Sequence, residues 1–148
     1  MDLIEYKMAS LRESKKLIKT PKKRYLESLH QQAFIQWSEL APLIYRDKRD
    51  GFINDYLAAI PNGGKRSKRE AARLKKEGVK AGVSDLFFAY PTTRYHGLWI
   101  EFKTDRAGSV LRENQQDWLA KMKRLEYQYA VPTSVTQAID IIEVYLLT

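Results

Sequence analysis

The sequence predicts an α/β fold in which helices flank one small sheet. Segments with apolar residues at three- and four-residue steps alternate with short apolar runs, and turn-forming residues separate most of them. A chain of 148 residues that is 44% hydrophobic also has enough apolar material for one sizeable core. We therefore expect a basic N-terminal arm over residues 1–21 and a single domain over residues 22–148.

The first half of the domain is predicted to contain two helices and one strand. Amphipathic spacing indicates a helix over 22–45 that Pro42 bends or ends, and a mixed apolar run indicates a short strand over 52–60. A very basic helix follows over 67–77, where Ser67 and Glu70 have the spacing of a capping box.

The second half is predicted to contain three strands and two helices. Strands over 85–90 and 97–103 are joined by a turn-rich segment, which suits an antiparallel hairpin. A helix over 112–126, a strand over 127–131 and a closing helix over 133–147 complete the order α-β-α-β-β-α-β-α.

Composition narrows the classes of function. The absence of cysteine excludes disulfides and thiolate zinc sites, and two histidines are too few for most all-histidine metal sites. The net charge of +8 favours a polyanionic partner, with nucleic acid first and an anionic membrane surface second. No run approaches the roughly 18 apolar residues of a membrane span, and the N-terminus lacks a secretory signal. We expect a soluble, cytoplasmic protein with no membrane association.

Three residues at the predicted hairpin form a candidate catalytic set. Glu101 and Lys103 lie on one face of a strand, about 6.6 Å apart along the chain, because side chains alternate. Asp85 starts the neighbouring antiparallel strand, so its carboxylate is expected beside Glu101. Two carboxylates and an ammonium suit Mg²⁺- or Mn²⁺-assisted phosphodiester hydrolysis, although an isolated Glu-x-Lys triplet is more often an exposed pair of charges.

Longer stretches resemble the VRR-NUC family, the virus-type replication-repair nucleases of the PD-(D/E)XK superfamily. The similarity lies in residues 82–85 (GVSD), 96–103 (HGLWIEFK) and 114–119 (NQQDWL). Residues 60–67 (IPNGGKRS) and 78–82 (GVKAG) also resemble stand-alone members from phages and bacteria. The resemblance implies a restriction-endonuclease-like core, with a mixed central sheet flanked by helices, and a protein of a bacterial or phage-infected cell.

The resemblance also implies roles for individual residues. It makes Asp85 and Glu101 the metal-binding carboxylates, with the Phe102 backbone carbonyl as a further ligand, and it makes Lys103 the catalytic lysine. Gln115 falls on the first turn of the following helix, where the family has a glutamine that helps to organise the active site.

The N-terminal helix and two departures from the family pattern complete the expected site. Glu27 fits the family's helix acid, which contributes to a metal site directly or through water. Ser84 stands where the family usually has proline, and Asn114 stands where an acid commonly precedes the glutamine. Neither change removes a ligand, so we expect an active enzyme.

A basic and glycine-rich region precedes the candidate site and is a candidate DNA-binding surface. Such charge runs are usually solvated faces, and the glycines suit an ordinary turn, but backbone amides and basic side chains also bind phosphates. The candidate residues are Asn62, Gly63, Gly64, Lys65, Arg66, Lys68, Arg69, Arg73 and Lys80.

These observations lead to an expected function and its alternatives. The resemblance implies a metal-dependent DNA endonuclease that acts on branched DNA, such as four-way junctions or flaps, and such a substrate suits a homodimer. Other functions remain open: a non-catalytic DNA-binding module with the same fold, and a nuclease of restriction or RNA processing.

Overall fold

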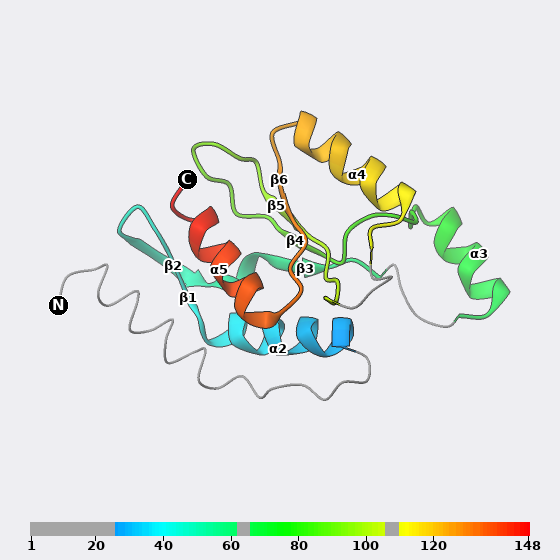
Figure 1. Ribbon diagram of the computed structural model, residues 1–148, viewed down its shortest axis with the longest axis horizontal. Coiled ribbons are helices and arrows are strands. Elements are labelled where there is room, and N and C mark those ends of the chain that lie inside the picture. Colours follow the sequence, from blue (N-terminus) through cyan, green and yellow to red (C-terminus); the bar gives the residue numbers. More distant parts are fainter. Residues whose placement is uncertain (1–25, 62–65, 106–109) are drawn as a thin grey trace.

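A mixed four-stranded sheet forms the centre of the molecule (Figure 1). The computed structural model describes residues 26–61, 66–105 and 110–148, so the predicted arm over 1–21 lies outside the described residues. The strands lie in the order β3 (Leu57–Ala59), β4 (Leu86–Phe88), β5 (Leu98–Ile100) and β6 (Gln128–Ala130). The β3–β4 and β4–β5 pairs are antiparallel and β5–β6 is parallel, which confirms the predicted hairpin and the mixed sheet.

Helices cover both faces of this sheet. On one face, α2 (Leu26–Leu40) contacts α5 (Val135–Tyr145), and on the other face α4 (Glu113–Arg124) lies against β6 (Figure 1). Helix α3 (Lys68–Lys76) stands at one end of the molecule and buries none of its residues. The architecture is the restriction-endonuclease-like α/β fold expected from the sequence.

The alternation of side chains along the strands divides the molecule into two layers. Leu86 and Phe88 are fully buried on the face of the sheet that α2 and α5 cover, where they share one apolar core with Trp37. On the opposite face, Phe87 stacks on Trp99 with ring centroids 4.4 Å apart. Trp118 of α4 contacts Trp99 edge-on, so that aromatic packing fixes α4 to the sheet.

The helix predicted over 22–45 is wrong beyond Leu40. Residues 42–45 instead form β1 (Pro42–Tyr45), which pairs in antiparallel fashion with β2 (Lys48–Phe52). Proline lacks the N–H that would continue the helix. The hairpin has no glycine at its turn, where Arg46 and Asp47 adopt φ values of 49° and 64°. Without the usual Asn-Gly signal, the turn and its two strands were not predictable from local sequence.

The single strand predicted over 52–60 is also wrong. Phe52 ends β2, residues Ile53–Tyr56 form a 3₁₀ turn named η1, and only Leu57–Ala59 form a strand. The Asp55 carboxylate accepts a hydrogen bond from the Phe52 N–H at 2.8 Å. A short acidic side chain thus offers the backbone an alternative to the ladder of the sheet.

The other predicted helices and strands are present but shorter than predicted; the strand predicted over 97–103 ends at Ile100, so Glu101 and Lys103 lie just beyond β5. The capping box before α3 is confirmed in part, because the Ser67 hydroxyl accepts a hydrogen bond from the Glu70 N–H at 3.1 Å. Ser134 caps α5 in the same way through the N–H of Gln137. None of the described helices is long and apolar enough to cross a membrane.

Candidate active site

The candidate carboxylates lie opposite each other where two strands end. Leu86 pairs with Ile100 in the antiparallel register, and one further step along the strands brings Asp85 opposite Glu101. The Asp85 Oδ2 accepts a hydrogen bond from the N–H of Phe102 at 2.8 Å. The side-chain convergence expected from the sequence is therefore present.

Backbone hydrogen bonds hold the strand end on its other side. The N–H of Glu101 donates to the Ala130 carbonyl at 3.0 Å, and the N–H of Lys103 donates to the Pro132 carbonyl at 3.1 Å. The 101–103 segment is thus fixed between Asp85 and the chain that follows β6. Its alternating geometry buries Phe102 in the core and directs Glu101 and Lys103 to the face on which α4 lies.

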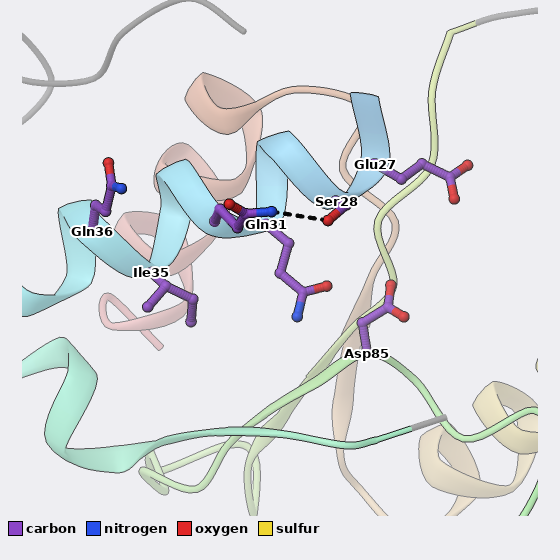
Figure 2. A pocket seen from close by; sticks show the side chains of 7 residues that line it. Glu27, Ser28, Gln31, Ile35, Gln36 and Asp85 are labelled. Atoms are coloured by element: carbon purple, nitrogen blue, oxygen red, sulfur yellow. Dashed lines mark hydrogen bonds between the residues drawn. The ribbon is translucent and has the colours of Figure 1, made fainter. Parts of the chain in front are cut away.

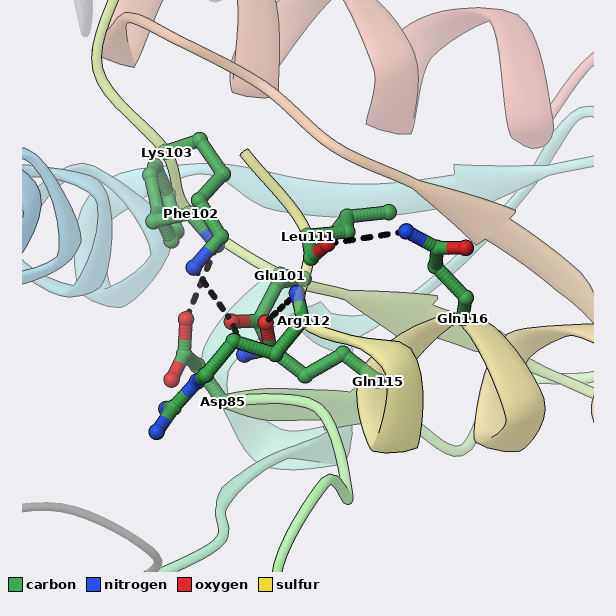
Figure 3. A network of polar contacts seen from close by, with 8 residues as sticks. All are labelled: Asp85, Glu101, Phe102, Lys103, Leu111, Arg112, Gln115 and Gln116. Carbon is green, nitrogen blue, oxygen red and sulfur yellow. Dashed lines mark hydrogen bonds and ion pairs between the residues drawn. The ribbon is translucent and has the colours of Figure 1, made fainter. Parts of the chain in front are cut away.

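Glu101 is the centre of a polar network (Figure 3). Only 3% of the residue is exposed, and its Oε1 contacts the Lys103 Nζ at 3.3 Å and accepts a hydrogen bond from the Gln115 side-chain amide. Its second oxygen, Oε2, is buried and has no hydrogen-bond partner. A buried carboxylate oxygen without a partner is costly, which makes this atom the best candidate for a ligand to a cation.

Burial raises the pKa of both acids. Desolvation, followed by the negative charge of Asp85, raises the pKa of Glu101 to about 7. Desolvation also raises the pKa of Asp85, against the opposing effects of the Phe102 N–H and the Lys103 ammonium. Glu101 is therefore poised to exchange its proton for a cation near neutral pH.

The first turn of α4 locks Gln115 in place. Gln115 is buried, with only 5% of the residue exposed, and its Oε1 accepts a hydrogen bond from the Arg112 N–H at 2.9 Å. The same amide group donates to Glu101, so Gln115 joins the helix start to the strand end. The structure therefore brings Gln115 to the site, as expected from the sequence.

A close backbone approach places α4 against the loop before Asp85. Gly82 has a φ of +90°, and a Cβ atom built on it would lie 2.6 Å from the Asn114 carbonyl oxygen. Only glycine combines this conformation with this space. Gly82 is thus a residue whose structural importance sequence spacing alone did not reveal.

An open pocket of about 600 Å³ lies between Asp85 and the first turns of α2 (Figure 2). Glu27 and Gln31 line it from the helix, together with neighbouring polar side chains. The Glu27 carboxylate contributes a charge that raises the pKa of Asp85. The structure thus places Glu27 near Asp85, on the α2 side of the same pocket.

Comparison with known proteins gives the family. The sequence profile of the VRR-NUC domain matches residues 8–136. The chain belongs to the VRR-NUC family. A solved structure described as a VRR_NUC domain protein is 30% identical in sequence, with a TM-score of 0.66, and the similarity covers 84% of this chain and 90% of that one. No curated protein matches the sequence significantly. The VRR-NUC domain is a nuclease domain, so nuclease activity and a nucleic-acid substrate follow from the family.

The acidic residues of this VRR-NUC domain suit a divalent cation. Asp85 and Glu101 supply hard oxygen atoms, and the partnerless Oε2 of Glu101 meets the requirement for a ligand that is not already engaged. Within the described residues, no group of three or more acidic or histidine side chains converges at metal-binding distances. The donor set therefore fits an ion that completes its coordination with backbone carbonyls, substrate oxygens and water.

The predicted DNA-binding residues have different environments. Asn62, Gly63, Gly64 and Lys65 lie outside the described residues. Arg66 is half-buried and donates to the Pro61 carbonyl at 2.6 Å. The remaining candidates, which are exposed on or beside α3, are Lys68, Arg69, Arg73 and Lys80.

Helix α3 presents its basic side chains to solvent. Arg73 forms an exposed ion pair with Glu77 at 2.7 Å, whereas the helix as a whole is dominated by lysine and arginine. In Figure 1, α3 stands at the end of the molecule where α4 begins, and the first turn of α4 carries Gln115 of the candidate site. This arrangement is compatible with a basic surface that continues from the site.

Proposed function

We propose that the protein is a metal-dependent endonuclease that hydrolyses phosphodiester bonds in DNA. The observation that carries the proposal is the facing pair Asp85 and Glu101, with Lys103 at 3.3 Å from Glu101 and a buried Glu101 oxygen that has no partner. An exposed, unrelated set of charges would have neither this burial nor this register. Membership of a nuclease family gives the arrangement its chemical context.

The proposed ligands of Mg²⁺ or Mn²⁺ are the carboxylates of Asp85 and Glu101 and the backbone carbonyl of Phe102. The ion would polarise the scissile phosphate and lower the pKa of the attacking water. The chain's own contribution is to hold both carboxylates in place before substrate arrives: the Phe102 N–H orients Asp85, and the Gln115 amide orients Glu101. Such pre-organisation avoids reorganisation during the reaction.

Lys103 and Glu27 have distinct proposed roles. The Lys103 side chain is only 12% exposed, so its ammonium is held beside the reacting groups and positions or activates the nucleophile. Glu27 lines the open pocket next to Asp85, where it is placed to bind a second ion or to contact the first one through water.

The proposed substrate is branched DNA, bound mainly through its phosphates. The net charge of +8 and the exposed basic residues of α3 support backbone binding with little reading of bases. A four-way junction needs a cut in each of two strands, which suits a two-fold dimer with one site per protomer. Light scattering of the protein with and without junction DNA measures this assembly, and a monomer in both conditions would contradict the dimer.

A cleavage assay tests the proposed function. Linear, flapped and four-way-junction DNA, with matched RNA, are incubated with Mg²⁺ or with EDTA. We expect metal-dependent cleavage of DNA that is lost in Asp85→Asn, Glu101→Gln and Lys103→Ala while DNA binding is retained.

Asp117→Asn is the matched control, because Asp117 is an exposed acid of α4 away from the network. This variant is expected to cleave like the wild-type protein. Binding without any metal-dependent cleavage by the wild-type protein would instead identify a non-catalytic DNA-binding module, and cleavage restricted to RNA would move the activity to RNA processing.

A further inference from the structure

Arg112 occupies an unusual position at the edge of the candidate site. It precedes the first residue of α4 and takes the N-cap position, which serine or another short polar residue usually occupies. Ser67 and Ser134 fill the same position before α3 and α5, and the hydroxyl of each accepts a backbone hydrogen bond. A guanidinium has no acceptor and cannot cap a helix in this way. The arginine at this position therefore indicates a role other than capping.

The backbone of Arg112 is tied to the catalytic network. Its N–H donates to Gln115 Oε1 at 2.9 Å, and the Gln115 amide donates to Glu101. The close approach of Gly82 to Asn114 holds the same turn against the loop that leads to Asp85. The base of the Arg112 side chain is thus fixed relative to both carboxylates.

The side chain itself extends from this fixed base toward Asp85 (Figure 3). Arg112 is exposed, so a ligand in the solvent can reach its guanidinium. Although burial dominates and raises the pKa of Asp85, the positive charge of Arg112 acts on that carboxylate in the opposite direction. The guanidinium is therefore close enough to influence the charge of the site, yet open to solvent.

The positive charge of Arg112 offsets the repulsion that a phosphate would meet at the two carboxylates of the site. A phosphodiester that approaches Asp85 and Glu101 brings a negative charge to two carboxylates, and the nearby Lys103 ammonium already contacts Glu101. Arginine offers a planar set of N–H donors that matches phosphate oxygens and stays charged at all relevant pH values.

We propose that Arg112 binds a phosphate of the DNA strand that occupies the active site. The proposal deepens the function proposed above and rests on it for the identity of the substrate. It assigns to the start of α4 two tasks that use different groups of the same turn: Gln115 orients the catalytic carboxylate, and Arg112 holds the strand to be cut.

A serine substitution separates a binding role from a structural one. Arg112→Ser removes the guanidinium and supplies a residue that caps helices well, so its melting temperature is expected to equal or exceed that of the wild-type protein. Arg112→Lys keeps the charge but loses the planar donor set. Arg124→Ala is the matched control, because Arg124 is an exposed arginine in the last turn of the same helix.

The probe is a set of DNA duplexes and junctions, each with one neutral methylphosphonate at a defined position around the cut. Equilibrium binding in EDTA and single-turnover cleavage in Mg²⁺ are measured for each variant. We expect Arg112→Ser to weaken binding about 10-fold or more, Arg112→Lys to fall between it and the wild type, and Arg124→Ala to match the wild type. At one phosphate, the methylphosphonate should weaken wild-type binding and leave Arg112→Ser unaffected.

Two results would overturn the proposal: unchanged binding by Arg112→Ser, or equal penalties from every methylphosphonate in the wild type and in Arg112→Ser. The binding measurement does not depend on cleavage. A wild-type protein that shows the position-specific effect but never cleaves would refute the nuclease activity and leave the phosphate contact in place.

Discussion

Helices α3 and α4 are both short and end in basic residues, but they are attached to the molecule in different ways. Helix α4 buries Gln115 and Leu119, packs Trp118 on the sheet, and reaches Glu101 through a side-chain hydrogen bond. Helix α3 buries none of its residues. The difference indicates that α4 helps to build the site, and it is the basis for proposing that α3 offers only charge to the substrate. Changes at Gln115 of α4 should therefore affect the chemical step, and changes in α3 should affect binding.

The largest decrease in cleavage rate is expected for a change at Gln115, which distinguishes α4 from α3. Gln115→Ala removes the amide that holds Glu101 Oε1, and the removal of such a supporting hydrogen bond typically costs about 10- to 100-fold in activity. Single-turnover rates at saturating DNA measure this decrease. Gln116→Ala is the control, since its side chain is exposed and donates to the Leu111 carbonyl at 2.9 Å. Equal rates for the two variants would contradict the role of the first turn of α4.

A smaller decrease is expected when α4 is displaced rather than altered. Gly82→Ala introduces a Cβ atom 2.6 Å from the Asn114 carbonyl oxygen, so the first turn of α4 must move. Because this turn carries Gln115, the displacement is expected to lower the cleavage rate on the order of 10-fold. Gly78→Ala is the control, because Gly78 has a φ of +98° but nothing within 4 Å of the added atom. Both variants should lose thermal stability, and only Gly82→Ala should lose catalysis.

Removal of charge from α3 should change binding and spare the chemical step. The triple variant Lys68→Ala, Arg69→Ala, Arg73→Ala is expected to weaken DNA binding several-fold. The slope of log K against log salt concentration should become shallower by about one unit for each phosphate that the variant no longer neutralises. The single-turnover rate at saturating DNA should not change.

A second triple variant on α4 controls for net charge. Lys121→Ala, Lys123→Ala, Arg124→Ala removes the same charge from the last turn of α4, whose three basic residues are also exposed. Equal weakening by both triple variants would show that binding follows overall charge, and would remove the special role of α3.

The last expected effect is on the stability of the metal-free protein. The Glu101 pKa is raised from 4.5 to about 7 by burial and by Asp85, so the folded protein retains a proton that the unfolded chain loses. Stability should therefore fall as the pH rises from about 4.5 to about 7, and then level off. Melting temperatures in EDTA measure this trend. The trend should be clearly weaker in Glu101→Gln, and an identical trend in both proteins would contradict the raised pKa of Glu101.

Much of the site could be predicted from the sequence because local rules determine it. Strand alternation placed Glu101 and Lys103 on one face, and the hairpin brought Asp85 opposite Glu101. The hairpin of β1 and β2 was missed because residues 46 and 47 adopt positive φ values without the glycine or asparagine that usually signals such a turn. Gly82 and Arg112 were missed for a related reason. Their importance depends on the approach of α4 to the loop before Asp85, and no local pattern encodes a meeting of segments so distant in sequence.

The central claim is that Asp85 and Glu101 together hold a divalent cation, and calorimetric titration of the metal-free protein with Mn²⁺ tests it most directly. At pH 7, in buffers of different ionisation enthalpy, the wild-type protein should bind the ion and release protons, because Glu101 must ionise to coordinate it. Asp117→Asn should behave identically, whereas Asp85→Asn and Glu101→Gln should bind far more weakly. Wild-type affinity and proton release in both acid variants would contradict the claim.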